Sequence, residues 1–152
     1  MTADAPATEP FIRPIEPADA DAAAGLALQL GYQRPAAAVR HWIENMPASG
    51  DQVAFVACLG AQVAGWIEVS VQKHLQSEPY ALISGLVIRE GLRGKGIGRL
   101  LCERAEQWAW NAGVTTVRVT SRSTRTDAHR FYLKGGYRKT KTSHVFEKAS
   151  SF

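Results

Sequence analysis

The chain has 152 residues, which suffices for one hydrophobic core and is short for two full domains. Apolar residues make up 45% of it and charged residues 21%, a balance typical of a globular protein in water. No apolar run approaches the length that a membrane-spanning helix needs, so a protein of that kind is not expected.

The first residues differ in composition from the rest. Residues 1–10 are rich in Ala, Pro and acidic side chains and carry no basic-then-apolar signal pattern, so we expect a flexible N-terminal tail on a cytoplasmic protein. The two cysteines, Cys58 and Cys102, each lie in an apolar stretch, and we expect buried free thiols. Neither has a neighbouring base that would favour a covalent acyl-enzyme.

Hydrophobic periodicity and turn residues predict alternating strands and helices. In chain order they indicate a strand over 11–15, helices over 17–30 and 35–46, a hairpin of strands 52–59 and 63–71, a strand over 80–88, a helix over 97–112, a strand over 114–120, a short helix over 126–134 and one or two terminal strands over 137–147. Asp19 is a candidate helix cap, and Gly31 and Pro47 end the first two helices. The order predicts a single α/β domain, with a mixed, mostly antiparallel sheet of about six to seven strands flanked by about four helices.

The helix over 97–112 carries apolar residues at helical spacing, which we expect to face the core. They are Ile97, Leu100, Leu101, Ala105, Trp108 and Ala112. Gly113 then ends the helix.

A glycine-rich turn precedes that helix. Residues 93–98 read Arg-Gly-Lys-Gly-Ile-Gly and follow the apolar run 83–88. Glycines let the backbone approach an anion closely, and the unpaired N–H groups of a helix's first turn point outward. Arg93, Lys95 and Arg99 add positive charge at the same point. The pattern predicts a site for a phosphorylated cofactor, and the alternative is a plain loop connection.

Two common phosphate-binding motifs do not fit this turn. A Walker-type loop needs a Lys followed by Ser or Thr after its second glycine, whereas Gly98 is followed by Arg99 and Leu100. A dinucleotide fingerprint needs a third glycine where Arg99 stands and an acidic residue about 20 positions on, and residues 113–125 contain no carboxylate. Both kinds of nucleotide site are therefore excluded.

Two motifs together resemble the GNAT superfamily of acyl-CoA-dependent N-acetyltransferases. Arg93, Gly96 and Gly98 match its pattern of Arg or Gln, two residues, Gly, one residue, then Gly or Ala. The stretch 128–132, Ala-His-Arg-Phe-Tyr, followed by Gly-Gly-Tyr at 135–137, matches a second motif in the family's order. Many relatives have an Asn before this second motif, whereas residues 121–125 read Ser-Arg-Ser-Thr-Arg, so the corresponding cofactor contact must differ or be missing.

The resemblance implies an N-acetyltransferase domain over 11–148 that uses acetyl-CoA as cosubstrate and no metal. The expected diphosphate site is Arg93, Gly94, Lys95, Gly96, Gly98 and Arg99. In this family the backbone amides of the preceding strand, here Leu86, Val87 and Ile88, polarise the acetyl carbonyl and pair with the pantetheine arm.

The chemistry requires a neutral amine, a donor for the carbonyl oxygen and a proton for the leaving thiolate. Tyr132 falls on the family's motif and is the candidate acid for the thiolate, the alternative being a ring packed beside Phe131. Glu68, a carboxylate among apolar neighbours in mid-strand, is the candidate base, and an outward-facing residue of an alternating strand is an equal alternative. His74 and His129 are weaker candidates.

The acceptor is the least determined part of the prediction. A small amine, an aminoglycoside-like polyamine, an amino acid and a protein N-terminus or lysine all remain open. Candidate pocket residues are Tyr32, Trp42, Trp66, Tyr80 and His144, with Asp51 and Glu78 as partners for a cationic amine.

Two further classes of function remain as alternatives. One is a non-catalytic CoA-binding regulatory module of the same fold. The other is a nucleic-acid-binding domain, suggested by basic residues crowded between 118 and 141. Aromatic residues suited to base stacking are sparse there, so we favour a solvated basic face and expect no nucleic-acid partner. Homodimerisation is left open.

Overall fold

A computed structural model describes residues 9–46 and 50–151. The chain divides into two units, one up to Val119 and the other from Thr120 on, and each is described by itself. The predicted tail 1–10 lies outside the described residues except for its last two positions, and the predicted helix stop at Pro47 also lies outside them.

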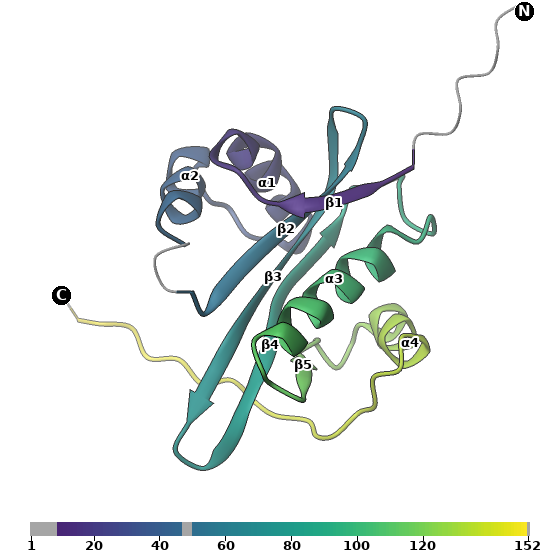
Figure 1. Ribbon diagram of the computed structural model, residues 1–152. Coiled ribbons are helices and arrows are strands. Elements are labelled where there is room, and N and C mark those ends of the chain that lie inside the picture. The colour runs from purple at the N-terminus through teal and green to yellow at the C-terminus, as the bar shows by residue number, and fades with distance from the viewer. Residues whose placement is uncertain (1–8, 47–49, 152) are drawn as a thin grey trace, which may run out of the picture. The chain divides into compact units, whose positions relative to one another are not determined.

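The first unit contains a five-stranded sheet (Figure 1). Its strands are β1 (Phe11–Pro14), β2 (Gln52–Leu59), β3 (Gln62–His74), β4 (Ser77–Ile88) and β5 (Val117–Val119), in the spatial order β1-β2-β3-β4-β5. Pairing is antiparallel except between β4 and β5, which run parallel. The mixed, mostly antiparallel sheet is thus confirmed, and β2 is buried from Ala54 to Cys58 as its apolar sequence predicts.

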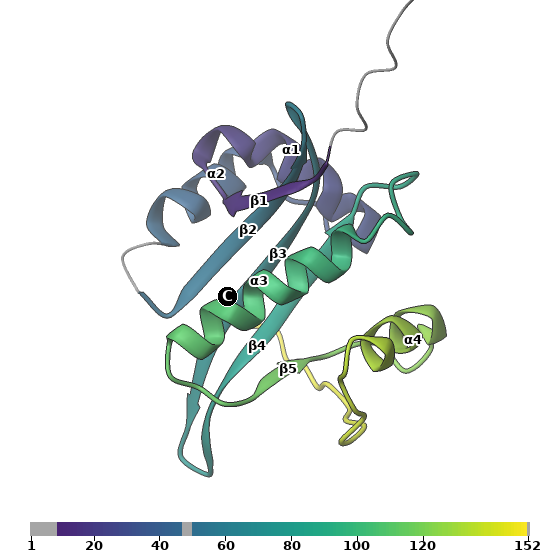
Figure 2. The same cartoon turned by 45° about the vertical axis from the view of Figure 1, so that its right-hand side comes forward.

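Helices cover both faces of this sheet. The predicted helix over 17–30 consists of η1 (Pro17–Asp19), α1 (Ala20–Ala27) and η2 (Leu28–Leu30), and it is followed by α2 (Ala36–Asn45) and, after β4, by α3 (Ile97–Asn111). The Trp66 indole of β3 donates to the Ala23 carbonyl of α1, whereas Arg104 of α3 lies over the Phe55 ring. Trp66 pairs with Val56, the neighbour of Phe55, so these contacts lie on opposite faces. Hence α1 and α2 cover one face and α3 the other (Figure 2).

The predicted buried face of α3 is partly wrong. Leu100 is 37% exposed and Ala112 is exposed, whereas Cys102 and Ala109 are buried. The buried stripe follows the i, i+4 spacing through Leu101 and Ala105, which turns Leu100 away from the sheet and leaves Ala112 past the last helical residue. The predicted buried, free state of Cys58 and Cys102 is confirmed.

The second unit contains α4 (Thr126–Lys134), whose bounds match the prediction. The predicted strands over 137–147 are wrong: among the described residues no strand follows α4, so the sheet has five strands and not six to seven. Val145 and Phe146 are 86% and 91% exposed, and the basic residues between them and α4 leave no continuous apolar face to bury. No helix in the described ranges has the length and apolar character that crossing a membrane requires.

Candidate active site

The glycine-rich loop connects β4 to α3, and its backbone conformation requires glycine at three positions. Gly91, Gly94 and Gly96 have φ values of +88°, +80° and +81°, the left-handed region that other residues rarely adopt. Gly96 is also the N-cap of α3 and contributes no side-chain hydrogen bond, so the first-turn N–H groups of α3 have no side-chain cap. Arg93 and Lys95 are exposed between these glycines. This donor set suits an anion such as a diphosphate.

The remaining two predicted diphosphate residues lie in α3 itself. Gly98 is the second residue of the helix, and Arg99 follows it. The Arg99 guanidinium lies 3.9 Å from a Glu103 carboxylate oxygen, and both side chains are more than half exposed. Such an exposed pair is weak, and it lies in the first turns of α3, next to the glycine-rich loop.

The strand before the loop has an open edge. β5 pairs only with Ala81–Ile83 of β4, so residues 84–88 have no strand on that side within the described part of the first unit. The Arg89 N–H donates to the Ala64 carbonyl of β3. Because backbone groups alternate along a strand, the N–H groups of Ile88 and Leu86 point to the open edge, and that of Val87 points to β3.

A β-bulge lies where this open edge begins. Glu68 pairs with Gly85 and Val69 pairs with Ile83, which leaves Ser84 as an extra residue in β4. A bulge bends its strand and increases the local twist. It therefore turns β4 at the point where its pairing with β5 ends.

Glu68 is half-buried beside the bulge, on the face that α1 and α2 cover. Trp42 of α2 donates its indole N–H to Glu68 Oε2 at 2.9 Å, and the Ser84 hydroxyl donates to Oε1 at 3.1 Å. Both donors are neutral, and no basic side chain in the described ranges forms an ion pair with Glu68. The site thus holds an oriented carboxylate that has no counterion among the residues described. Trp42 was predicted as a pocket residue but not as a partner of Glu68. Ser84 was missed, although a glycine next to it inside an apolar strand is a signal for a bulge.

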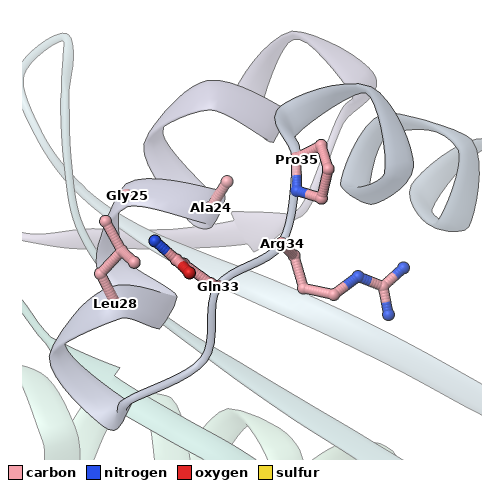
Figure 3. A pocket seen from close by; sticks show the side chains of 6 residues that line it. All are labelled: Ala24, Gly25, Leu28, Gln33, Arg34 and Pro35. Carbon is pink, nitrogen blue, oxygen red and sulfur yellow. The ribbon is translucent and has the colours of Figure 1, made fainter.

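An open pocket of about 440 Å³ lies between α1 and the segment that leads to α2 (Figure 3). It is lined by Ala24, Gly25, Leu28, Gln33, Arg34 and Pro35. The lining is largely apolar, and Arg34 contributes its one charged side chain. The pocket therefore presents an apolar surface and one cationic side chain to a ligand.

Tyr132 belongs to the second unit. Its ring packs edge-on against Phe131 and Tyr137, with centroid distances of 5.2 and 5.9 Å. The Tyr132 ring thus packs beside Phe131, as one of the two alternatives for this residue predicted, and its role as an acid stays a prediction. His129, in the same unit, has its Nε2 2.8 Å from the Arg122 carbonyl oxygen.

The other predicted acceptor residues do not form one cluster. Trp66 is part of the packing between sheet and α1, whereas Tyr32 is well exposed. His74 stacks on Tyr80, and the Arg118 guanidinium lies over the Tyr80 ring, 4.1 Å from its centroid. No group of three His, Cys, Asp or Glu side chains suited to a metal occurs among the residues described.

Comparison with known proteins agrees with this geometry. Residues 21–137 match the model of the acetyltransferase (GNAT) family. The chain is 35% identical to the aminoalkylphosphonate N-acetyltransferase of Salmonella typhimurium over 86 residues, which is 56% of either protein. It is 27% identical to the aminoglycoside N(6')-acetyltransferase type 1 of Stenotrophomonas maltophilia over 139 residues, covering 88% of this chain and 90% of that enzyme.

Solved structures show the same fold. An aminoglycoside N-acetyltransferase AAC(6')-Iy in complex with CoA superposes with a TM-score of 0.83 at 18% identity, over 93% of this chain and 96% of that one. Since the family match covers most of the sequence, from α1 to the residues just after α4, the chain belongs to the acetyltransferase (GNAT) family.

Proposed function

We propose that this protein transfers an acetyl group from acetyl-CoA to a primary amine by direct nucleophilic attack, with residues 11–148 as the catalytic domain. The observation that carries the proposal is the order of features along β4. The carboxylate of Glu68 lies at the Ser84 bulge, the open backbone edge follows up to Ile88, and the glycine-rich loop comes next. From the bulge to Ile88 the strand rises about 13 Å.

These features match the parts of the two substrates. A cationic amine has its counterion in Glu68, and the amide groups of a pantetheine arm have edge partners in Leu86 and Ile88. A diphosphate has the loop amides, Arg93, Lys95 and Arg99. Acetyl-CoA supplies the activated acetyl thioester.

The chain's own residues then serve the reaction as follows. Glu68 attracts the ammonium form of the acceptor and removes a proton, while Trp42 and Ser84 hold its two oxygens in place. The neutral nitrogen forms the new C–N bond, and an N–H at the open edge stabilises the negative carbonyl oxygen. As the C–S bond breaks, Tyr132 donates a proton to the thiolate. A side-chain nucleophile is unnecessary on this route.

A cationic primary amine is the acceptor class that this arrangement favours. The carboxylate without a counterion supports a positively charged group, and the Trp42 indole beside it offers an aromatic surface to the same cation. Two named relatives, an aminoglycoside and an aminoalkylphosphonate N-acetyltransferase, suggest a polyamine and a zwitterionic amine as the first acceptors to test.

The test is an acceptor panel monitored by release of free thiol from acetyl-CoA. The panel contains an aminoglycoside, an aminoalkylphosphonate, an amino acid and a lysine-containing peptide. We expect Glu68→Gln to lower kcat/KM for the active acceptor by about 10²- to 10⁴-fold with little change in the KM for acetyl-CoA. Glu44→Gln, a matched change at an exposed position of α2, should leave both unchanged.

If no amine stimulates thiol release although the protein binds CoA normally, the proposed enzymatic activity is contradicted. The non-catalytic CoA-binding regulatory module is then favoured. Full activity in Glu68→Gln would remove Glu68 from the mechanism while leaving the acetyltransferase in place.

A further inference from the structure

Gln29, a residue of η2, connects the end of β4 to the start of the glycine-rich loop. Its side-chain N–H donates to the Ile88 carbonyl at 2.9 Å, and its side-chain oxygen accepts from the Glu90 N–H at 3.0 Å. Both partners are backbone groups about 60 residues further along the chain. The exposed Gln29 carboxamide therefore donates through its nitrogen and accepts through its oxygen, and it pairs with two consecutive outward-facing backbone groups.

These two backbone groups lie on the open edge of β4. The Arg89 N–H points to β3, where it meets the Ala64 carbonyl, so the Ile88 carbonyl and the Glu90 N–H point the other way. The carboxamide thus takes the place that a residue of a neighbouring parallel strand would occupy. The Gln29 carboxamide lies where the open edge ends. It occupies the Ile88 carbonyl, whereas the N–H groups of Leu86 and Ile88 remain directed outward.

The same contact fixes the position from which the loop starts. Gly91 follows Glu90 directly, and the loop contains two further glycines with a positive φ. Because glycine has much backbone freedom, ordering this loop costs considerable conformational entropy. On the β3 side, the Arg89 guanidinium donates twice to the Val63 carbonyl, at 3.1 and 2.8 Å. The strand end is therefore held from both sides, by Arg89 and by Gln29.

We propose that Gln29 is a positioning residue for the cosubstrate: it aligns the open edge of β4 with the loop that receives the diphosphate. This inference rests on the proposed function. It assigns to the α1–η2 segment a role in cosubstrate binding that neither motif of the sequence indicates, because Gln29 lies well before both.

The experiment compares Gln29→Ala and Gln29→Asn with wild type in CoA titration calorimetry and in steady-state kinetics. The Asn side chain keeps the amide but is one methylene shorter, so it cannot reach both backbone partners. We expect both variants to raise the Kd for CoA and the KM for acetyl-CoA about tenfold, with kcat and the acceptor KM within about twofold of wild type. The control Gln107→Ala removes an exposed amide of α3 that bonds to Asn111, and it should change none of these.

Salt dependence separates positioning from charge. Gln29 is neutral, so its tenfold effect should be the same at low and high ionic strength. Lys95→Ala removes an exposed cation from the loop, and its effect on CoA binding should shrink as salt is added.

Each outcome bears on a definite claim. Wild type that binds no CoA would overturn the proposed function and this inference with it. Wild type that binds CoA, with unchanged Kd in both Gln29 variants, would overturn the inference alone. A fall in kcat and a rise in both KM values together would also overturn it, because that is the effect of general structural damage. If Gln29→Ala does not fold, Gln29→Asn decides the matter.

Discussion

Replacing Asp19 by Ala should destabilise the fold substantially, because this carboxylate is buried and accepts several hydrogen bonds. Asp19 is 6% exposed and accepts two hydrogen bonds from the Arg13 guanidinium, at 2.7 and 2.9 Å, and one from the Glu16 N–H at 2.8 Å. These contacts tie β1 to the start of the first helical segment. Asp19 was predicted as a helix cap, and it is the N-cap residue of α1, although its side chain makes no cap bond to that helix. Its carboxylate instead closes the capping box of η1 through the Glu16 N–H and has the guanidinium of Arg13, in the preceding strand, as its main partner.

The magnitude follows from the number and kind of bonds. Hydrogen bonds to a charged group contribute about 1.5–3 kcal/mol each, and leaving one partner of a buried pair alone costs about 3–5 kcal/mol. The Arg13 side chain is 29% exposed, so water recovers part of the loss. We therefore expect Asp19→Ala to lower the free energy of unfolding by about 2–4 kcal/mol. The Tm should fall by about 5–15 °C.

The effect should depend on pH in a defined direction. The hydrogen bonds from Arg13 and then from the Glu16 N–H hold the pKa of Asp19 below its ordinary value of 3.8. A depressed pKa in the folded state stabilises the fold above the unfolded pKa, and this contribution is lost as the pH falls through the folded pKa. The difference in the free energy of unfolding between wild type and Asp19→Ala should therefore have its full size at neutral pH and shrink below about pH 4.

Urea unfolding followed by the fluorescence of the four tryptophans measures this difference. Lys73→Ala is the control, since it removes an exposed ion pair with Asp51 that spans 3.8 Å. It should cost less than about 0.5 kcal/mol. An Asp19→Ala protein as stable as the control at pH 7, or a difference that grows on acidification, would refute the reasoning.

Three further predictions concern packing, catalysis and thiol chemistry. Gly85→Ala would place a Cβ 2.7 Å from the Trp66 ring and should cost about 1–3 kcal/mol in urea unfolding, whereas Gly25→Ala, at an open helical position, should be neutral or stabilising. Tyr132→Phe should lower kcat by about 10²-fold or more without changing the Kd for CoA, and unchanged turnover would exclude the acid role. Burial raises the pKa of the Cys102 thiol to about 12, so a thiol reagent at pH 8 should label native protein far more slowly than urea-unfolded protein; equal rates would contradict its burial.

Local signals in the sequence predicted much of the architecture. The helix over 126–134 and the strand 52–59 have the predicted bounds, because helical periodicity, apolar runs and the glycines that end them act within a few residues. The glycine-rich loop was predicted for the same reason: its conformation depends on which of its own residues accept a positive φ. The family resemblance rests on these local patterns.

Pairing between distant segments explains the errors. An extended segment becomes a strand only where another strand offers free backbone groups, and residues 137–147 alternate too weakly to indicate whether a partner exists. The exposed position of Leu100 depends on how α3 is rotated on the sheet, which no single helix determines.

The sequence by itself thus determined the order of the elements, the loop that suits an anion and the identity of Glu68 as an unusual carboxylate. Only the tertiary structure decided what surrounds them: Trp42 and Ser84 on Glu68, the bulge in β4 and the Gln29 carboxamide at its end. The physical reason is that backbone conformation responds to neighbouring residues, whereas a side chain's hydrogen-bond partners depend on which distant segments the packed core brings within about 3 Å.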